Sequence, residues 1–377
     1  MMTRRWIEIG LLICTALIVS ACGMEDDEEP ISVDDPSEAD GEGVAALGGG
    51  EDSLDAVEVT TIADDDEELD GPRDVEFNPE APEQMWVVNY ADNSTVVVLD
   101  PGTDEQTHEY FRTTGSDHFL AKPAALAFGD PGFMATAQQE DEETQPTTPE
   151  DFMGPVLWPT DLNDYDAGHP SHLDMLHNSP LSSGVAWDEG NAYWIFDGYH
   201  GSLTRYDFNE PHPPGGEDHT DGVIERYADG EVGIADEVVA HLDMDHDTDL
   251  LYAADTENNR VVTLDTTAGE EGDAISPSYD QCEQRHIDDA ELSTVIDGDE
   301  FEMTQPAGLE LHDDLLFVGD NGTSTIYAFD LEGELVDRLD VSEEIPAGAM
   351  MGLAIDEDDR VYAVDSENDA IVRFGPK

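Results

Sequence analysis

The stretch "LLYAADTENNRVVTLD", from Leu250 to Asp265, holds two short apolar runs separated by a polar turn. Both runs have the length and the β-branched and aromatic content of strands, and the acidic and asparagine residues between them are typical of turns. The stretch "VYAVDSENDAIVRF", from Val361 to Phe374, repeats this arrangement. The two copies indicate a repeat built from short antiparallel strands.

The repeat recurs along most of the chain. Six units open with an apolar run, at "PRDVEF" (Pro72), "PAALAF" (Pro123), "SSGVAW" (Ser182), "AHLDMD" (Ala240), "PAGLEL" (Pro306) and "MGLAID" (Met351). Each opening run is followed by a second one, most units add a third, and outer fourth strands are expected at "THEYFRTT", "GVIERYAD", "AELSTVID" and "GELVDRLD". Six units of three or four strands predict an all-β fold, a six-bladed β-propeller, in which radial closure leaves few exposed strand edges.

A strand ahead of the first unit is expected to close the ring. The last unit stops after "AIVRFG" without a fourth strand, whereas "VEVTTI", Val57 to Ile62, stands alone before the first unit. Pairing of this segment with the last unit would supply the missing edge. The expected propeller therefore spans residues 54–377.

The two stretches quoted first resemble NHL repeats, in which a strand ends in aspartate, passes through an asparagine-rich turn and re-enters a strand. The resemblance covers about residues 72–377 and is weakest in the second unit. It implies an NHL-like propeller in which four aspartates cap equivalent turns, with metal binding as the alternative role: Asp197, Asp255, Asp320 and Asp365. It also implies that the loop into each inner strand and the turn between the second and third strands share one face.

Two similar segments, "HLDMLH" at 172–177 and "HLDMDH" at 241–246, contain several of the candidate site residues. By the NHL geometry, the first lies in the loop that enters the third blade, and the second is an inner strand. We therefore expect one pocket at the channel mouth, formed by His172, Asp174, His177, Tyr199, His200 and His241. His212 and His219 are expected on the opposite face.

The imidazole and carboxylate donors of this pocket favour Zn²⁺ as the cofactor, with copper as an alternative. A weak Ca²⁺ site in "DMDHDTD", 243–249, is a further alternative, although this stretch lacks the glycine and the glutamate of an EF-hand loop. Without a metal, His241 would bond to backbone groups around the channel, Tyr199 would pack at the rim and His177 would cap a turn.

The stretch "FDGYHGSLTRYDF" and the following "AHLDMDHDTDLLYAADTENNRV" resemble two successive blades of the peptidyl-hydroxyglycine amidating lyase. This resemblance implies a catalytic role for Tyr199 and zinc ligation by His241. The family's other two zinc histidines correspond to about Ala124 and Met351, and its catalytic arginine has no counterpart in "WVVNYADNSTV". A zinc site of this kind would need His172 and His177 as replacement ligands.

The chain is strongly acidic, with 92 acidic residues against 13 basic ones and a formal net charge of −79. Nucleic acid and anionic lipid surfaces are therefore not expected as partners, because both would meet a like charge. Acidic residues in every loop favour adaptation to a saline, halophilic habitat over a dedicated Ca²⁺ store.

The N-terminus has the features of an export signal. Two arginines precede an apolar run from Ile7 to Val19, which is too short for a comfortable membrane span. The adjoining "VSAC" resembles a bacterial lipobox, which implies removal of a signal peptide, residues 1–21, and lipidation of Cys22. The residue after Cys22 is Gly23 and not the aspartate that retains such lipoproteins at the inner membrane, so the outer membrane is favoured.

Residues 22–53 are acidic and glycine-rich, and a disordered tether is expected there. The sequence thus predicts an envelope-anchored, monomeric lipoprotein that binds a small molecule, a protein or a divalent metal at the channel mouth of its propeller. A metal-dependent lyase or hydrolase is the alternative, with Tyr199 as acid/base because a neighbouring metal would lower its pKa. A protein-interaction scaffold is the second alternative, and whether the protein is an enzyme stays open.

Overall fold

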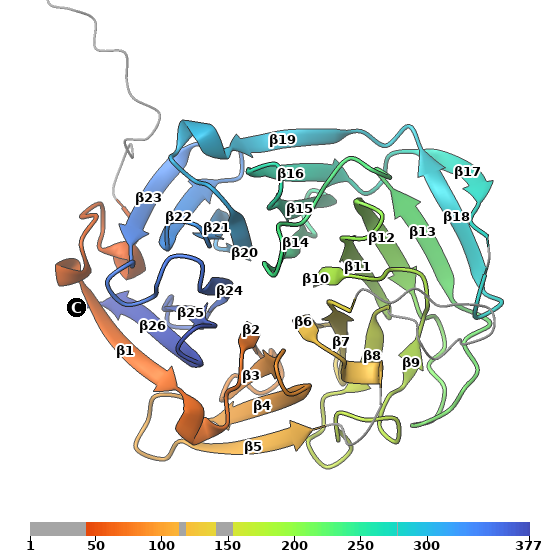
Figure 1. The fold of residues 1–377 in the computed structure, drawn as a ribbon, viewed down its shortest axis with the longest axis horizontal. Helices are drawn as coiled ribbons and strands as arrows, with labels where there is room; N and C mark the ends of the chain where they lie inside the picture. The colour runs from red at the N-terminus through yellow and green to blue at the C-terminus, as the bar shows by residue number, and fades with distance from the viewer. Residues whose placement is uncertain (1–42, 113–117, 141–153, 277) are drawn as a thin grey trace, which may run out of the picture. The chain divides into compact units, whose positions relative to one another are not determined.

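The protein is described by a computed structural model that covers residues 43–112, 118–140, 154–276 and 278–377. These residues form six β-sheets arranged as blades around a common centre (Figure 1). The all-β, six-bladed propeller predicted from the repeat is confirmed. The predicted signal peptide, the lipidated Cys22 and the tether up to residue 42 lie outside the described residues.

The first three blades follow one another along the chain, and in each the strands run in chain order from the centre of the ring outward. Blade one contains β2 (Pro72–Phe77), β3 (Gln84–Asn89), β4 (Ser94–Leu99) and β5 (Thr107–Arg112). Blade two contains β6 (Pro123–Phe128), β7 (Phe133–Gln138), β8 (Val156–Pro159) and β9 (Asp174–Met175). Blade three contains β10 (Ser182–Trp187), β11 (Ala192–Asp197), β12 (Ser202–Asp207) and β13 (Val223–Tyr227).

The other three blades complete the ring. Blade four contains β14 (Leu242–Asp245), β15 (Leu250–Asp255), β16 (Arg260–Asp265) and β19 (Leu292–Asp297). Blade five contains β20 (Pro306–His312), β21 (Leu315–Asp320), β22 (Thr325–Asp330) and β23 (Leu335–Asp340). Blade six contains β24 (Met350–Ile355), β25 (Val361–Asp365), β26 (Ala370–Pro376) and, as its outer strand, β1 (Val57–Ala63).

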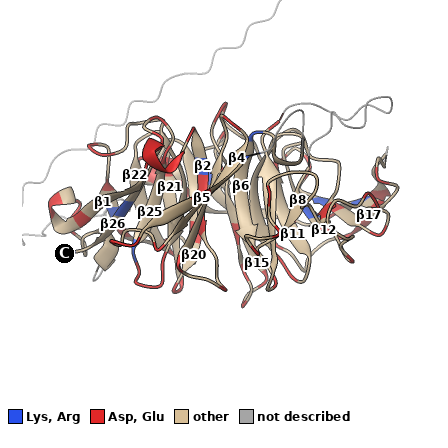
Figure 2. Ribbon diagram, turned by 90° about the horizontal axis from the view of Figure 1, so that it is seen from below, with Lys and Arg blue, Asp and Glu red and all other residues tan. Residues whose placement is uncertain are grey.

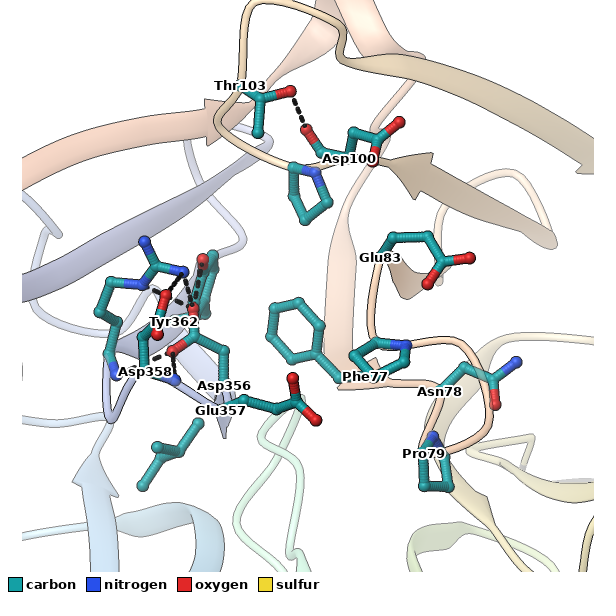
Figure 3. Close-up of a pocket in the computed structure, with 14 residues that line it drawn as sticks. Phe77, Asn78, Pro79, Glu83, Asp100, Thr103, Asp356, Glu357, Asp358 and Tyr362 are labelled. Carbon is teal, nitrogen blue, oxygen red and sulfur yellow. Dashed lines mark hydrogen bonds and ion pairs between the residues drawn. The ribbon is translucent and has the colours of Figure 1, made fainter.

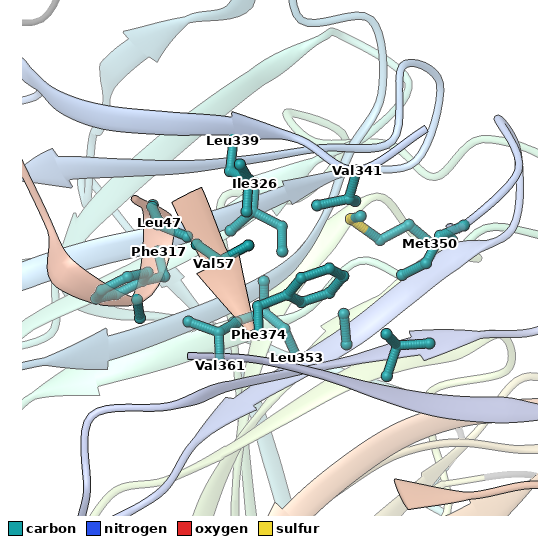
Figure 4. Close-up of a cluster of buried hydrophobic side chains, with 14 of the residues drawn as sticks. Leu47, Val57, Phe317, Ile326, Leu339, Val341, Met350, Leu353, Val361 and Phe374 are labelled. Carbon is teal, nitrogen blue, oxygen red and sulfur yellow. The ribbon is translucent and has the colours of Figure 1, made fainter. Parts of the chain in front are cut away.

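The pairing of β1 with β26 closes the ring as the sequence predicts. The two strands are antiparallel, with Val57 opposite Pro376 and Ala63 opposite Ile371 (Figure 1). The hydrophobic core beneath this pairing joins blades five and six, because Leu47 and Val57 lie among Phe317, Ile326 and Leu339 of blade five and Phe374 of blade six (Figure 4).

The packed part of the chain begins earlier than the predicted end of the tether at residue 53. Ala46 and Leu47, in the short 3-10 helix η1 (Ala45–Leu47), are 1% and 0% exposed. Oδ2 of Asp337 accepts hydrogen bonds from the backbone N–H groups of Val44 at 2.7 Å and Gly50 at 3.0 Å. The apolar "VAAL" within an otherwise acidic, glycine-rich stretch is what anchors this segment.

The turn aspartates have the capping role that the NHL resemblance implies. The backbone N–H of His200 donates to Oδ1 of Asp197 at 3.0 Å, and that of Thr323 donates to Oδ2 of Asp320 at 3.0 Å. The N–H of Asn368 donates to Oδ1 of Asp365 at 3.1 Å. These bonds hold the tight connection between the second and third strands of each of these blades.

Two features of the outer rim were not predicted from the sequence. Blade two gains β8 and the two-residue β9 from a region where the repeat could not be followed. A hairpin of β17 (Glu270–Ala274) and β18 (Glu283–Asp288), inserted between β16 and β19 of blade four, extends blade three because β18 pairs in parallel with β13.

Acidic residues occur in loops on both faces of the propeller and along its outer strands, whereas basic residues are few (Figure 2). This distribution agrees with the formal net charge of −79 for the whole chain. Among the described residues, no helix has the length and apolar character needed to cross a membrane.

Candidate functional site

The centre of the ring is enclosed by the inner strands β2, β6, β10, β14, β20 and β24 (Figure 1). Neighbouring inner strands approach so closely that their backbones are hydrogen-bonded, as between His241 N–H and the Ala307 carbonyl at 3.0 Å. Gly352 is required at this level, because a Cβ there would clash with the Asp74 carboxylate and the His241 ring. The channel is therefore nearly filled at its middle.

The end of the channel at which the inner strands begin is covered by the segment that precedes β14. Val238 and Val239 of this segment are 6% and 0% exposed and belong to the same core cluster as Ala124 and Met351. Arg73 Nη1 donates to the Glu237 carbonyl at 2.6 Å, and Gln139 Nε2 donates to the Val238 carbonyl at 3.0 Å. Apolar packing therefore covers the end of the channel at which the sequence predicts the pocket around His241.

His241 occupies the middle of the channel and is only 5% exposed. Its Nε2 lies 3.2 Å from the carbonyl oxygen of Ala124 on blade two, and its Nδ1 lies 3.5 Å from Oδ1 of Asp74 on blade one. Asp74 in turn accepts hydrogen bonds from the backbone N–H groups of Val75 at 2.9 Å and Leu126 at 2.8 Å. The sequence allows either zinc ligation or bonding to groups around the channel for His241, and the geometry supports the second role.

A cavity of about 300 Å³ opens on the other side of His241, toward the C-terminal ends of the inner strands. It is lined by residues from β2, β6, β10, β14 and β20, and four of these residues are acidic: Asp74, Glu76, Asp243 and Glu310. None of the described residues that line the cavity is a lysine or an arginine, and its bases are His241 and His246. The cavity is thus an acidic chamber at the centre of the propeller.

The acidic chamber has two layers that follow from strand periodicity. Val75 of β2 and Leu242 of β14 are buried residues at equivalent positions of their strands. Asp74 and His241, the residues directly before them, form the inner layer. Two residues further along each strand, the side chains point the same way again. Glu76, Asp243 and Glu310 form this second layer, which lies closer to the opening.

The carboxyl groups of the acidic chamber hold protons more strongly than free carboxyls. Burial raises the pKa of Asp74 to about 6, against the opposing effect of His241. Burial also raises the pKa of Asp243 to about 6, although backbone N–H groups partly compensate for it. Burial, followed by the charges of neighbouring carboxylates, places the pKa values of Glu76 and Glu310 well above the usual range.

Sequence reasoning missed Asp74, Glu76 and Glu310, although a signal was present. "PRDVEF" and "PAGLEL" place carboxylates at alternate positions of apolar strands, in the same register as His241 and Asp243. A charged side chain that points into the interior from an inner strand costs folding free energy unless it has a partner or a ligand. Comparison of the inner strands at these positions would have identified the acidic chamber.

Tyr199 and His200 lie in the β11–β12 turn, outside the acidic chamber. Tyr199 is 45% exposed, and the centroids of its ring and the His200 ring are 4.9 Å apart. His200 Nδ1 lies 2.8 Å from Oδ2 of Asp197, the aspartate that caps the turn. Neither residue is among the described residues that line the cavity with His241, so the structure does not assemble the predicted lyase-like pair.

The remaining predicted ligands also lie away from His241. His177 pairs with Asp280 of the β17–β18 connection, with Nδ1 2.6 Å from Oδ1. Asp174 belongs to β9, the outer strand of blade two, and His172 precedes it. These two residues were expected at the channel because "HLDMLH" was assigned to the loop entering blade three, whereas it forms the end of blade two.

His172 and Asp174 instead meet the two histidines that were expected on the opposite face. One ring nitrogen from each of His172, His212 and His219 lies within 4.8 Å of the other two. His219 Nδ1 lies 2.8 Å from Oδ1 of Asp174. The predicted exclusion of His212 and His219 from this set is therefore wrong.

A second cavity, of about 480 Å³, lies between blades one and six. Asp356 and Tyr362 form one side of it, Asn78 and Glu83 form the other, and Phe77 lies between them (Figure 3). Arg360 Nε and the Tyr362 hydroxyl donate to Oδ2 of Asp356 at 2.7 and 2.9 Å. The Asp356 charge is thus compensated by an arginine, whereas no lysine or arginine is among the described residues that line the acidic chamber.

No protein-family model matches the chain, and no curated protein matches it either. Solved structures do match. An auxiliary nutrient binding protein from Bacteroides ovatus has a TM-score of 0.52 at 12% identity, over 85% of this chain and 76% of its own. A luciferin-regenerating enzyme has a TM-score of 0.51 at 12% identity, over 84% and 94%. A protein of unknown function from Bacteroides thetaiotaomicron has a TM-score of 0.53 at 13% identity, over 84% and 75%. At this level of identity the chain is similar to these proteins in its propeller fold alone.

Proposed function

We propose that this protein is a non-catalytic binding module that takes a small organic cation into its acidic chamber. The observation that carries the proposal concerns Glu76 and Glu310. Within the described part of the chain, neither carboxyl group takes part in a hydrogen bond or an ion pair, although both line the cavity. Burial, followed by the charges of neighbouring carboxylates, raises their pKa values, and a bound cation would favour the ionised forms.

The other residues of the chamber favour an organic ammonium group over a bare metal ion. Phe77, Phe128 and Trp187, the last residues of β2, β6 and β10, line the same cavity as the carboxylates. Aromatic rings attract ammonium groups, most strongly where water is excluded. A volume of about 300 Å³ also exceeds the space that a single metal ion fills, and falls in the range of small-molecule pockets.

Calorimetric titration of the purified protein with a quaternary ammonium ion, a primary diamine and Ca²⁺ tests the proposal. The Glu76→Gln/Glu310→Gln double variant should bind the diamine at least about tenfold more weakly, since a hydrogen bond to a charged group is worth roughly 1.5–3 kcal/mol. It should also bind the quaternary ammonium ion more weakly, because the carboxylates that attract it are gone. Glu357→Gln, which removes a carboxylate from the neighbouring cavity, is the matched control and should bind normally. Equal affinity in the double variant would refute the proposal, and binding of Ca²⁺ alone would reassign the chamber to a metal.

Catalysis is not part of the proposal. A metal-dependent lyase or hydrolase would need Tyr199 and the predicted histidine ligands around His241. These residues do not line the cavity that contains His241. The auxiliary nutrient binding protein from Bacteroides ovatus shares this fold, and its name is in keeping with a binding role.

The proposal includes export and anchoring to the cell envelope through lipid on Cys22, with the outer membrane as the expected location. The basic residues, apolar run and "VSAC" at the N-terminus support it. We also assign the repeats to the NHL type, on the basis of their aspartate-capped turns. A monomer without nucleic-acid partners is expected from the net charge of −79.

A further inference from the structure

The three-histidine cluster, formed by His172, His212 and His219, lies outside the acidic chamber. His172 comes from the β8–β9 connection of blade two, and His212 and His219 come from the β12–β13 connection of blade three. His172 is 1% exposed and His212 is 8% exposed. Histidines this deeply buried in close contact need a physical reason, because each could repel the others on protonation.

The hydrogen bonds of the cluster fix the same tautomer in all three rings. Nδ1 of His172 lies 2.7 Å from the His169 carbonyl, and Nδ1 of His212 lies 2.9 Å from the Pro213 carbonyl. Nδ1 of His219 lies 2.8 Å from Oδ1 of Asp174. Since each of these oxygens can only accept a hydrogen bond, every Nδ1 is the donor, and in the neutral ring the lone pair is on Nε2.

The Nε2 atoms of two of these rings are buried without a partner. Nε2 of His172 and Nε2 of His212 are both enclosed and make no hydrogen bond within the described residues. A buried, unpaired acceptor costs free energy, and a bound cation would recover it.

We infer that the three-histidine cluster is a Zn²⁺ site that fastens the outer loops of blades two and three together. Histidines that bind a metal through one ring nitrogen usually donate the other ring N–H to a carbonyl or carboxylate oxygen, which fixes the orientation of the ring. All three imidazoles of the cluster have this arrangement. Asp174 acts as the positioning residue for His219 in that shell. One ring nitrogen of each histidine already lies within 4.8 Å of one from each of the other two, so small ring rotations would be needed to reach Zn–N distances of about 2.0–2.1 Å.

The two loops are already held in the register that the site requires. The backbone N–H of His212 donates to the Leu173 carbonyl at 3.1 Å, and that of Gly215 donates to the His172 carbonyl at 2.9 Å. A Cβ on Gly216 would fall 2.7 Å from Cγ of His212, so glycine leaves the room in which the ring lies. Because His219 is half-buried, a fourth ligand such as water could reach the ion from this side.

Calorimetric titration of chelator-treated, full-length protein with Zn²⁺ tests the inference. Wild type should bind one equivalent, and His212→Gln and His219→Gln should lose it. Asp174→Asn should weaken binding by about 10–100-fold, the effect of losing a second-shell partner. X-ray absorption at the zinc edge should count three imidazole nitrogens, a readout that a purely structural role of these residues would not produce.

Two controls separate this site from the rest of the molecule. His108→Gln removes an exposed histidine paired with Glu68 and should bind Zn²⁺ normally. The Glu76→Gln/Glu310→Gln variant should also bind normally, so failure of the acidic chamber as a cation site would leave this inference standing. If His212→Gln fails to fold, His219→Gln is the decisive variant. The His219 side chain is 15% exposed, so its replacement should disturb the fold less.

Three outcomes would overturn the inference. Wild-type protein that binds no Zn²⁺ is the first, and unchanged binding by a folded His219→Gln protein is the second. Loss of Zn²⁺ in the Glu76→Gln/Glu310→Gln variant alone is the third, because it would place the ion in the acidic chamber.

Discussion

Nδ1 of His241 lies 3.5 Å from Oδ1 of Asp74, and this pair joins blade four to blade one across the centre of the ring. The same imidazole reaches blade two through the carbonyl of Ala124. One side chain thus links three blades at the point where the channel is narrowest. Its place between buried groups makes His241 part of the structure that supports the acidic chamber.

His241→Ala should destabilise the fold by about 1–3 kcal/mol, because it removes the buried side chain that contacts both the Asp74 carboxyl and the Ala124 carbonyl. Urea denaturation at pH 7 measures the change. His108→Ala, at an exposed position, should lie within about 0.5 kcal/mol of wild type. A His241→Ala protein of unchanged stability would show that the contact contributes nothing to the fold.

The stability of the ligand-free protein should fall as the pH rises from 5 to 8. The native pKa values of Asp74 and Asp243 are about 6, and those of Glu76 and Glu310 lie well above the usual range, whereas the unfolded chain should have values of about 3.9 for aspartate and about 4.3 for glutamate. Between these values the native state binds more protons than the unfolded state, so raising the pH costs stability. Thermal unfolding measures this dependence.

The control for the pH dependence must suppress the general repulsion of a highly acidic chain. At 1 M NaCl the Debye length is about 3 Å, so exposed charges are screened while buried ones are not. Under this condition the Glu76→Gln/Glu310→Gln variant should lose less stability between pH 5 and 8 than wild type. Parallel curves for the two proteins would contradict the assignment of the effect to the acidic chamber.

Leu47→Ala should cost about 2–5 kcal/mol, the usual range for removing a fully buried leucine side chain. Leu47 is 0% exposed, whereas Leu54 is only partly buried against the same core cluster. Leu54→Ala is therefore the matched control and should cost clearly less. If Leu47→Ala has no effect in chemical denaturation, residues 43–53 behave as the tether that the sequence predicts.

Cys22→Ser should release the protein from the membrane fraction of the cell, because the thiol that would carry the lipid is gone. Cell fractionation and mass spectrometry of the N-terminal peptide measure the outcome. Cys282→Ser is the control, since Cys282 is buried beside the β17–β18 hairpin and should not affect anchoring. Membrane association of the Cys22→Ser protein would contradict the lipobox interpretation.

The fold could be predicted because each blade repeats the same local signals. Apolar runs such as "LLYAAD" and "RVVTLD" became β15 and β16 with their turn in the expected place. The β17–β18 hairpin gave no such signal, because "EEGDA" and "EQRHID" are polar. Arg285 of β18 forms ion pairs with Glu225 of β13 and Glu271 of β17, and contacts of this kind leave no hydrophobic periodicity in the sequence.

The candidate sites were only partly predictable, and one misassigned strand accounts for most of the difference. The rule that third-to-fourth-strand connections lie opposite the second-to-third turns is consistent with the structure. Because β8 and the two-residue β9 were not recognised, His172 was placed in the wrong kind of connection. Had "VLWP" been read as the third strand of blade two, the rule would have brought His172 to His212 and His219. The cover formed by Val238 and Val239 depends on tertiary contacts that no local pattern encodes.

The pairing of β1 with β26 has a consequence for how the molecule is made. β1 is synthesised before every other strand of the propeller and β26 after them, so blade six can be completed only when the rest of the ring exists. Until then β1 is an unpaired strand, able to pair with other chains. When the chain emerges from a ribosome or an export channel with its N-terminus first, β1 therefore stays unpaired until β26 has emerged. Truncation within β26 would yield an open ring, which proteases could distinguish from the finished protein.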